Sequence, residues 1–300
     1  MKYVIDTDPG HDDVMAIILA VKAGLDVVAL TTVAGNSTIE NTTRNARYAL
    51  DLLNRNDIPV YSGSEKPLDR ELIESPFHGR GGLDDLASSY SDDLTNNAVE
   101  QLLSIIEQNE KTSLIALGPL TNVAKAILSK PELVSKLEEI VIMGGAIRVP
   151  GNKNRVAEFN IFIDPEAADI VFRFPVIKTI IPLDACNNVK LYLKDFEKIK
   201  GKLKKPLLQI AGPYITHLDE DEGVKAALMY DPLTVYYIIN PGACILQQFD
   251  ILVETRGGLT RGMTVADLRN KPEKTNMINV VASINPYKFR KDFIKYLSSA

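Results

Sequence analysis

Short apolar runs alternate with amphipathic segments along much of the chain. In the amphipathic segments apolar residues recur at helical spacing, as at positions 14, 17, 18 and 21, which predicts helices, while the short apolar runs predict strands. We expect strands at 2–7, 27–33, around 60, and at 113–117, 140–143, 176–181 and 249–254. We expect helices at 12–23, 39–53, 97–108, 122–128 and 165–172.

The alternation of strand and helix predicts the fold class. Repeated strand–helix–strand units form a mainly parallel sheet with helices on both faces. Several expected strands, such as 140–143, are continuous apolar runs, which is typical of strands buried on both faces. Beyond about residue 185 the pattern is mostly helical, and neither a linker nor an internal repeat divides the chain. We therefore predict a single α/β domain over residues 1–300, with a Rossmann-like central sheet and a mostly helical C-terminal portion.

Composition and charge narrow the class of protein. The chain has 300 residues, of which 45% are hydrophobic and 24% charged, as in ordinary globular proteins. Its net charge is −5, whereas nucleic-acid-binding domains usually carry a basic excess, so we expect no nucleic-acid partner. No apolar run reaches the roughly 20 residues that span a bilayer, so we expect no membrane contact. Only two cysteines occur, which favours a reducing compartment and a cytoplasmic location.

Four aspartates gather where the first expected strand turns into the first helix. Residues 6–13 read DTDPGHDD and carry Asp6, Asp8, Asp12 and Asp13. The Pro-Gly pair makes a turn, so these acids lie at the carboxyl edge of the sheet, where open α/β folds bind ligands. One or two acids here could simply complement the helix dipole. Four clustered carboxylates repel one another, however, and their oxygens suit a hard cation such as Ca²⁺ or Mg²⁺. The segment predicts a metal site.

This segment resembles the N-terminal signature of the inosine–uridine-type nucleoside hydrolases, Asp-x-Asp-Pro-Gly-x-Asp-Asp. Further blocks resemble the same family in the same order: AGN at 34–36, LGPLTN at 117–122, MGG at 143–145, AEFN at 157–160, DP at 231–232 and LTRG at 259–262. Any one block is a weak signal, but together they span most of the chain. The resemblance implies an enzyme that hydrolyses the N-glycosidic bond of a small-molecule ribonucleoside, releasing ribose and the free nucleobase.

The resemblance also implies one Ca²⁺ per subunit and assigns roles to the acids. By position, four residues would supply oxygens to the ion: Asp8, Asp13, Asp231 and, through its backbone carbonyl, Leu117. Ribose hydroxyls and a water would complete a shell of the size that Ca²⁺ accepts. The ion would orient the sugar and activate the attacking water, whose proton Asp12 would take as general base. Asp6 would orient the loop from behind the ligands.

Five further residues match family positions that contact the ribose: Asn36, Met143, Asn152, Glu158 and Asn160. Oxygen atoms near the sugar would stabilise the oxocarbenium-like transition state better than the ground state. Without the resemblance, Asn36 and Asn152 would be ordinary turn residues, because each adjoins a glycine.

The nucleobase side departs from the family pattern. Many members have a histidine directly before the C-terminal metal aspartate, where this chain has Tyr230. Of the three histidines, His11 lies in the signature, His78 matches a family histidine that faces the base, and His217 lies in the stretch that forms a variable helix near the base. The leaving-group proton could come from His78, His217, Tyr230 or solvent. The preference for purines or pyrimidines stays open.

Two other functions fit parts of the sequence. Residues 6–8 also read as the Asp-x-Asp of haloacid-dehalogenase-like phosphatases, although Pro-Gly-His follows in place of Asp-Gly-Thr. A ribose-binding or nucleoside-binding protein without turnover would keep the metal residues, but the presence of Asp12 argues against it. The glycines in GRGG at 79–82 suggest a phosphate loop, yet the Lys-Ser/Thr ending is missing.

The resemblance to the nucleoside hydrolases also implies that the chain assembles as a homodimer or homotetramer.

Overall fold

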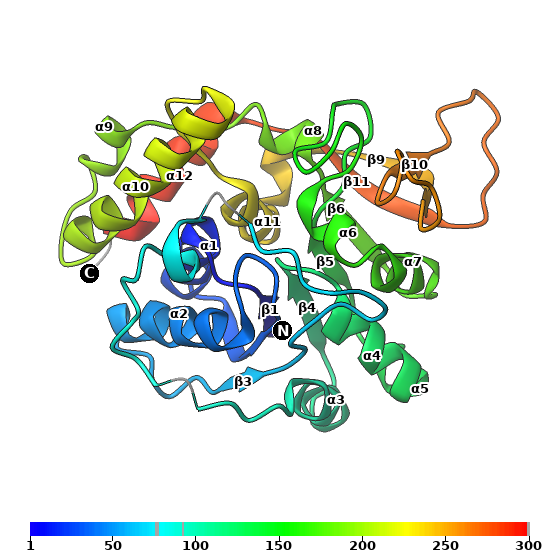
Figure 1. Ribbon diagram of the computed structural model, residues 1–300, viewed down its shortest axis with the longest axis horizontal. Helices are drawn as coiled ribbons and strands as arrows, with labels where there is room; N and C mark the ends of the chain where they lie inside the picture. Colours follow the sequence, from blue (N-terminus) through cyan, green and yellow to red (C-terminus); the bar gives the residue numbers. More distant parts are fainter. Residues whose placement is uncertain (76–77, 92, 299–300) are drawn as a thin grey trace.

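A mainly parallel sheet runs through the middle of the protein, whose computed structural model describes residues 1–75, 78–91 and 93–298. Within these residues nine strands follow the order β10-β9-β11-β6-β5-β4-β1-β2-β3 (Figure 1). Their bounds are β1 Lys2–Thr7, β2 Asp26–Thr32, β3 Val60–Ser62, β4 Thr112–Ala116, β5 Ile140–Met143, β6 Lys178–Ile181, β9 Cys244–Val253, β10 Thr264–Ala266 and β11 Met277–Ile284. The pairs from β11 through β3 are parallel. Only β9 pairs antiparallel in this sheet, with β10 and β11.

Helices cover both faces of the sheet. On one face lie α1 (His11–Lys22), α2 (Ile39–Leu52), α8 (Leu183–Cys186) and α11 (Tyr230–Ile239). A further layer packs against α1 and consists of α9 (Leu193–Phe196), α10 (Lys204–Glu222) and α12 (Pro286–Ser298). The other face of the sheet packs against α3 (Ala98–Gln108), α4 (Thr121–Ser129), α5 (Pro131–Val134), α6 (Phe159–Ile163) and α7 (Pro165–Arg173). The short elements β7 (Lys190–Leu191) and β8 (Ala227–Leu228) form a separate antiparallel pair. The predicted fold class, an α/β protein with a mainly parallel sheet between helices, is confirmed.

The two hydrophobic cores explain why the strands read as apolar runs. Successive side chains of a strand point to opposite faces of a sheet. In β1, Val4 belongs to the core beneath α3 and α4, whereas Ile5 belongs to the core beneath α1 and α11, and both are fully buried. Apolar residues are therefore needed at consecutive positions, so that the strand lacks the usual alternation.

The C-terminal portion contains more strand than the sequence pattern predicts. The strand expected at 249–254 begins earlier, at Cys244, and β10 and β11 were not anticipated. The segment 245–248 is exposed, so no alternation of buried and exposed positions marks it as strand. Its strand conformation comes from antiparallel pairing with β11, a partner about thirty residues away. The helices α8 to α12 nevertheless contain more residues of this portion than its strands do.

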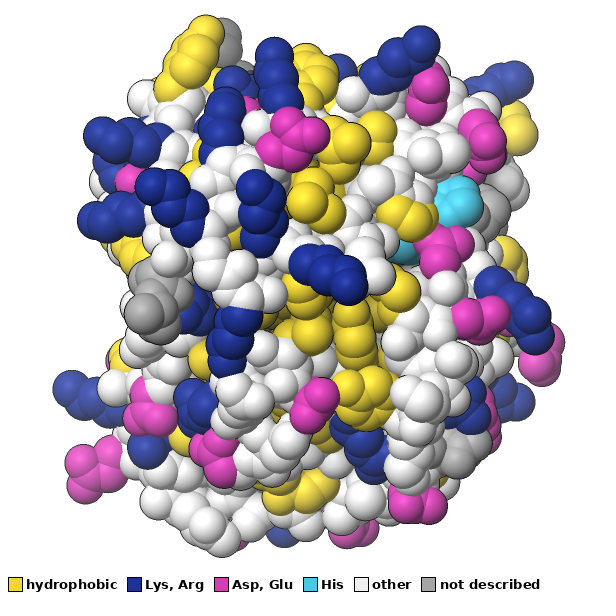
Figure 2. Space-filling model, turned by 90° about the vertical axis from the view of Figure 1, so that its left-hand side faces the viewer, with side chains coloured by type: hydrophobic (Ala, Val, Ile, Leu, Met, Phe, Trp, Pro, Cys, Tyr) yellow, Lys and Arg dark blue, Asp and Glu magenta, His cyan; other side chains and the backbone are white. Residues whose placement is uncertain are grey.

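The surface over α9 and α10 is rich in lysine. The lysines at 198, 200, 202, 204 and 205 are all exposed, and Lys and Arg side chains gather on this face (Figure 2). Exposed lysines of this kind are typical of a solvated face.

None of the described helices combines the length and the apolar character needed to cross a membrane.

One buried aspartate links three segments on the face of the sheet that carries α4 and α7. Asp164 is fully buried and accepts hydrogen bonds from the Ala167 backbone N–H (3.0 Å), the Thr121 hydroxyl (2.6 Å) and the Leu68 backbone N–H (2.9 Å). The first of these bonds caps α7, and the others tie α4 and the segment after β3 to it.

Asp164→Ala should therefore lower the free energy of unfolding by about 3 kcal/mol, because it leaves buried donors without an acceptor. Urea denaturation of both proteins measures the difference. Asp169→Ala is the matched control, because Asp169 lies on the same helix and pairs with Arg173 near the surface at 2.8 Å. Its effect should stay within about 0.5 kcal/mol. Equal effects of the two changes would contradict a linking role for Asp164.

Candidate active site

A pocket opens at the carboxyl edge of the parallel strands, as the position of the acidic segment predicts. Most of the predicted site residues line it: Asp12, Asn36, His78, Leu117, Met143, Asn152, Glu158, Asn160, Tyr230 and Asp231. Asp8 and Asp13 lie directly beneath, fully buried. The lining also includes residues that sequence reasoning did not single out: Ser75, Phe159, Tyr214, Leu218 and Glu222.

The floor of the pocket is a cluster of buried carboxylates. Asp12 and Asp13, in the first turn of α1, meet Asp231, in the first turn of α11, with carboxylate oxygens within 4.8 Å of one another. Asp13 accepts hydrogen bonds from the Thr7 hydroxyl (2.6 Å) and the Gly10 backbone N–H (3.0 Å). The packing of α11 against α1 thus adds a third carboxylate to two that are neighbours in sequence.

Asp8 is held beside this cluster by very close backbone contacts. Its Oδ2 accepts a hydrogen bond from the Asn36 backbone N–H at 2.7 Å. A Cβ atom at Gly35 would lie 2.1 Å from Oδ2, and one at Gly118 would lie 2.5 Å from Oδ1, so only glycine leaves room. The AGN and LGPLTN blocks therefore each contribute a glycine that admits the same carboxylate. Oδ1 is buried, and none of the described residues forms a hydrogen bond with it.

Burial and mutual repulsion disfavour the ionised form of these acids. Burial and the nearby Asp13 raise the pKa of Asp8 and of Asp12 well above the usual value. Burial, with Asp13 and Asp12 close by, does the same to the pKa of Asp231. A cation would remove this cost, because it stabilises the carboxylates in their charged form. The unpartnered Asp8 Oδ1 and the all-oxygen donor set fit a hard divalent ion.

Asp6 lies behind the cluster and ties three elements together. Its Oδ1 accepts hydrogen bonds from the Thr31 hydroxyl on β2 (2.6 Å) and the Asn122 amide on α4 (2.8 Å). Burial raises the pKa of Asp6 to about 6. These contacts occupy Oδ1 alone, and the orienting role of Asp6 stays a prediction.

The predicted ribose-contacting residues form one connected wall. The Asn160 amide donates to the Leu117 carbonyl at 2.6 Å, and the Asn36 amide donates to Asp13 Oδ2 at 3.2 Å. Glu158 caps α6 and accepts from the Asn160 and Ile161 backbone N–H groups. Burial raises the pKa of Glu158 to about 7. The amides and carboxylates that would meet a sugar are therefore positioned by the same contacts that hold the acidic floor.

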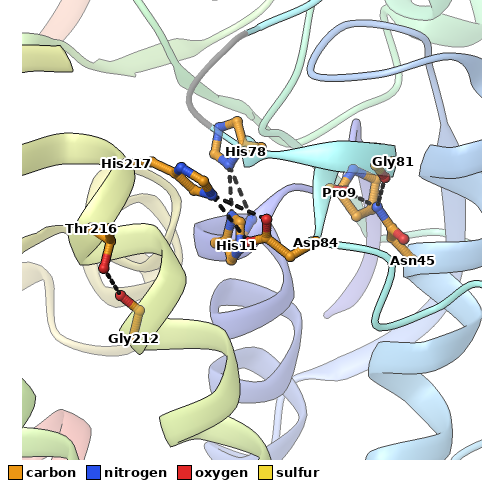
Figure 3. Close-up of polar contacts among 9 residues, drawn as sticks. All are labelled: Pro9, His11, Asn45, His78, Gly81, Asp84, Gly212, Thr216 and His217. Carbon is orange, nitrogen blue, oxygen red and sulfur yellow. Dashed lines mark hydrogen bonds and ion pairs between the residues drawn. The ribbon is translucent and has the colours of Figure 1, made fainter. Parts of the chain in front are cut away.

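The opposite end of the pocket is aromatic. His78 stacks on Tyr214 with ring centroids 5.6 Å apart, and Tyr230 completes the lining beside Leu218. His217 does not line the pocket; its Nε2 lies 3.1 Å from Asp84 Oδ1 (Figure 3).

The lining residues of α10 could have been found in the sequence. Positions 214, 218 and 222 follow one another at four-residue spacing, which places them on one face of a helix.

Residues 3–291 match the family model described as inosine-uridine preferring nucleoside hydrolase. The chain belongs to this family. It is 40% identical over 291 residues to the pyrimidine-specific ribonucleoside hydrolase RihA of Escherichia coli (strain SMS-3-5 / SECEC), covering 92% of this chain and 93% of that protein. It is 41% identical over 288 residues to RihA of Shewanella sp. (strain MR-4), covering 92% and 90%.

Solved structures of nucleoside hydrolases also match this chain. A plant nucleoside hydrolase superposes with a TM-score of 0.92 at 31% identity, over 100% of this chain and 99% of that one. A purine-preferring ribonucleoside hydrolase from Gardnerella vaginalis gives 0.90 at 28% identity, over 99% and 98%. The protein is thus a nucleoside hydrolase, and the predicted family and enzyme class are confirmed. The family generally depends on a metal, and Asp12, Asp13 and Asp231 form a cluster of the kind that can hold one.

Adding Ca²⁺ to the chelator-treated nucleoside hydrolase should raise its melting temperature. A ligand that binds only the folded state at about 100 times its Kd adds about 2.7 kcal/mol to the free energy of unfolding. Calorimetry with EDTA and with Ca²⁺ measures the shift, which Asp231→Asn should abolish. Asp250→Asn is the control, since Asp250 is buried away from the site and bonds Asn276. It should lower the melting temperature but keep the shift. An unchanged shift in Asp231→Asn would contradict the metal site.

Proposed function

We propose that this nucleoside hydrolase cleaves ribonucleosides at a Ca²⁺ held by Asp8, Asp13, Asp231 and the Leu117 carbonyl, with Asp12 as general base. The observation that carries the proposal is the buried carboxylate cluster on the floor of a pocket whose wall is lined by amides and Glu158. The bound cation would orient the ribose hydroxyls and lower the pKa of the attacking water. Every donor is an oxygen, as Ca²⁺ prefers.

Asp12 is the carboxylate placed to receive a proton in the pocket. It lines the pocket, whereas Asp8 and Asp13 lie beneath it. Asp231 also lines the pocket but is a proposed ligand of the ion, which leaves Asp12 available to accept a proton. The attacking water therefore loses its proton to Asp12 as its oxygen approaches the C1′ atom of the ribose.

The ribose wall favours the transition state over the ground state. Positive charge develops on C1′ and the ring oxygen as the glycosidic bond breaks. The oxygens of five residues, together with the sulfur of Met143, surround the sugar in this proposal: Asn36, Asn152, Glu158, Asn160 and Asp12. Hydrogen bonds fix the positions of these side chains; for example, the Phe159 backbone N–H donates to Asn152 Oδ1 at 2.9 Å. Little reorganisation therefore accompanies the reaction.

The departing nucleobase would lie at the aromatic end, against His78 and Tyr230. Burial raises the pKa of the Tyr230 phenol well above its usual value, so it keeps its proton and can donate a hydrogen bond. His78 is the better placed of the two histidines to supply a proton, because it lines the pocket whereas His217 bonds Asp84. We therefore assign the leaving-group contact to His78 and Tyr230, and an indirect role to His217.

Base preference is best tested with pyrimidines first. The RihA proteins at 40% and 41% identity are pyrimidine-specific, whereas the Gardnerella vaginalis enzyme of similar fold is purine-preferring. A panel of uridine, cytidine, inosine and adenosine, with 2′-deoxy controls and ribose release as the readout, tests both the activity and the preference. Absence of ribose release from every ribonucleoside would contradict the proposed function.

We also propose that the enzyme acts in the cytoplasm in nucleoside salvage, as a homodimer or homotetramer. Both cysteines, Cys186 and Cys244, are free thiols, which suits a reducing compartment. Light scattering at micromolar concentration tests the assembly.

Asp12→Asn should lower kcat by about 10²–10⁴-fold, the usual effect of a lost general base. The Ca²⁺-induced rise in melting temperature should remain, because the change spares the proposed ligands. Steady-state kinetics and calorimetry on the same preparation measure both. Near-normal kcat would mean that Asp12 only supports the start of α1.

His78→Ala and Tyr230→Phe should separate proton donation from sugar binding. Nitrophenyl riboside has a leaving group that needs no proton, so the variant that lacks the true donor should still cleave it. The same variant should lose at least about tenfold in kcat/KM on natural nucleosides, or about 1.4 kcal/mol of transition-state stabilisation. Equal losses on both substrates would assign the residue to ribose positioning or to the fold.

A further inference from the structure

Asp84 joins three parts of the molecule at the base end of the pocket, and the mechanism above gives it no role. It follows His78 in the loop that crosses the start of α1 (Figure 3). Asp84 Oδ2 lies 3.0 Å from His11 Nε2, at the first residue of α1, and Oδ1 lies 3.1 Å from His217 Nε2, on α10. One carboxylate therefore bridges two helices that flank the pocket.

His78 contacts both the backbone and the ring of His11, whose Nδ1 lies 3.3 Å from His78 Nδ1. The His11 backbone N–H donates to His78 Nδ1 at 3.2 Å. A backbone N–H can only donate, so Nδ1 is the acceptor and neutral His78 carries its proton on Nε2. The ring also packs against two other rings, with centroids 5.5 Å from His11 and 5.6 Å from Tyr214, which are 5.4 Å from each other. No described residue hydrogen-bonds Nε2, which leaves this N–H free for a ligand in the pocket.

Two glycines make room for this arrangement. A Cβ at Gly79 would lie 2.0 Å from Asp84 Oδ1 and 2.9 Å from His217 Nε2, and φ at Gly79 is +63°. A Cβ at Gly10 would lie 2.5 Å from His78 Nδ1. Asp84 itself has φ of 48°, a left-handed conformation that a non-glycine residue adopts at a cost. The local backbone is therefore fitted to these contacts, and the contacts offset its strain.

The charge state of Asp84 suits a bridge. Partial burial opposes ionisation, but hydrogen bonds from His11 and His217 hold the pKa of Asp84 below its usual value. An ionised carboxylate only accepts, so both histidines present an N–H to it. His11 thus contacts Asp84 through its ring and His78 through its backbone N–H.

We propose that Asp84 is a positioning residue for His78: by bridging His11 and His217 it fixes the loop over the base end and presents the His78 Nε2–H to the departing nucleobase. This inference rests on the proposed role of His78. It assigns His217 to the bridge and explains why a histidine outside the pocket lies so close to it.

Asp84→Ala should lower kcat/KM on a natural nucleoside by at least about tenfold, while kcat/KM on nitrophenyl riboside stays within about threefold of the native value. The reason is that the loss falls on the leaving-group contact and spares the sugar. Asp84→Asn should recover part of the loss, because its amide oxygen can still accept from one histidine.

Asp85→Ala is the matched control. Asp85 is the next residue in the loop and has a similar φ of 58°. Its side chain forms a surface ion pair with Arg80 at 3.3 Å. Its removal should leave both substrates within about twofold, since exposed pairs contribute little. A loss equal to that of Asp84→Ala would trace the effect to the backbone conformation and overturn the proposal.

The double variant His78→Ala/Asp84→Ala distinguishes positioning from general support of the fold. If Asp84 acts through His78, the double variant should be no slower on natural nucleosides than His78→Ala alone. Independent effects would multiply, which would overturn the proposal. So would an equal loss on nitrophenyl riboside in Asp84→Ala. If His78→Ala is unimpaired on nucleosides, the positioning proposal is overturned, whereas ribose release by the native enzyme would still support the proposed function.

Discussion

Four aspartate side chains buried at one edge of the sheet are the constraint on which the rest of this enzyme depends. Asp8, Asp12, Asp13 and Asp231 repel one another where little solvent screens them, and a fold would ordinarily avoid such a cluster. The protein keeps it by surrounding the acids with fixed donors, such as the Thr7 hydroxyl and the Asn36 backbone N–H. The remaining negative charge of the cluster is not neutralised by these donors. It can therefore contribute to the binding free energy of a divalent cation.

The contacts that hold the acidic cluster also restrain the proposed sugar end of the pocket. The loops that follow β1, β2 and β4 meet around Asp8, where Gly35 and Gly118 allow contacts that a side chain would block. The Asn36 amide donates to Asp13 in this floor, and the Asn160 amide donates to the Leu117 carbonyl in the loop after β4. These loops start from parallel strands that are buried on both faces, so they have little freedom to move. Rigid loops of this kind suit the proposed recognition of an invariant ribose.

The base end is built differently. It is formed by one face of α10 and by the loop that carries His78, which bonds α2 through Asn45 and bonds α1 and α10 through Asp84. Here the chain has Tyr230 where many members of the family have histidine, and Glu222 completes the helix face. Base preference can therefore change through a few side chains, while the acidic floor and the ribose wall stay as they are.

The sequence by itself determined the parallel α/β sheet, the acidic segment at its edge and the family blocks, because these depend on local periodicity and on residues that are neighbours in the chain. It did not predict β11, whose pairing with β9 is long-range, nor the exposed half of β9. The match of Asp231 to the family suggested its position, but only the packing of α11 on α1 brings its carboxylate beside Asp12 and Asp13. The bridge from Asp84 to His11 and His217 had no sequence signal, because its three residues are far apart in the chain and meet only when the loop and α10 close over α1.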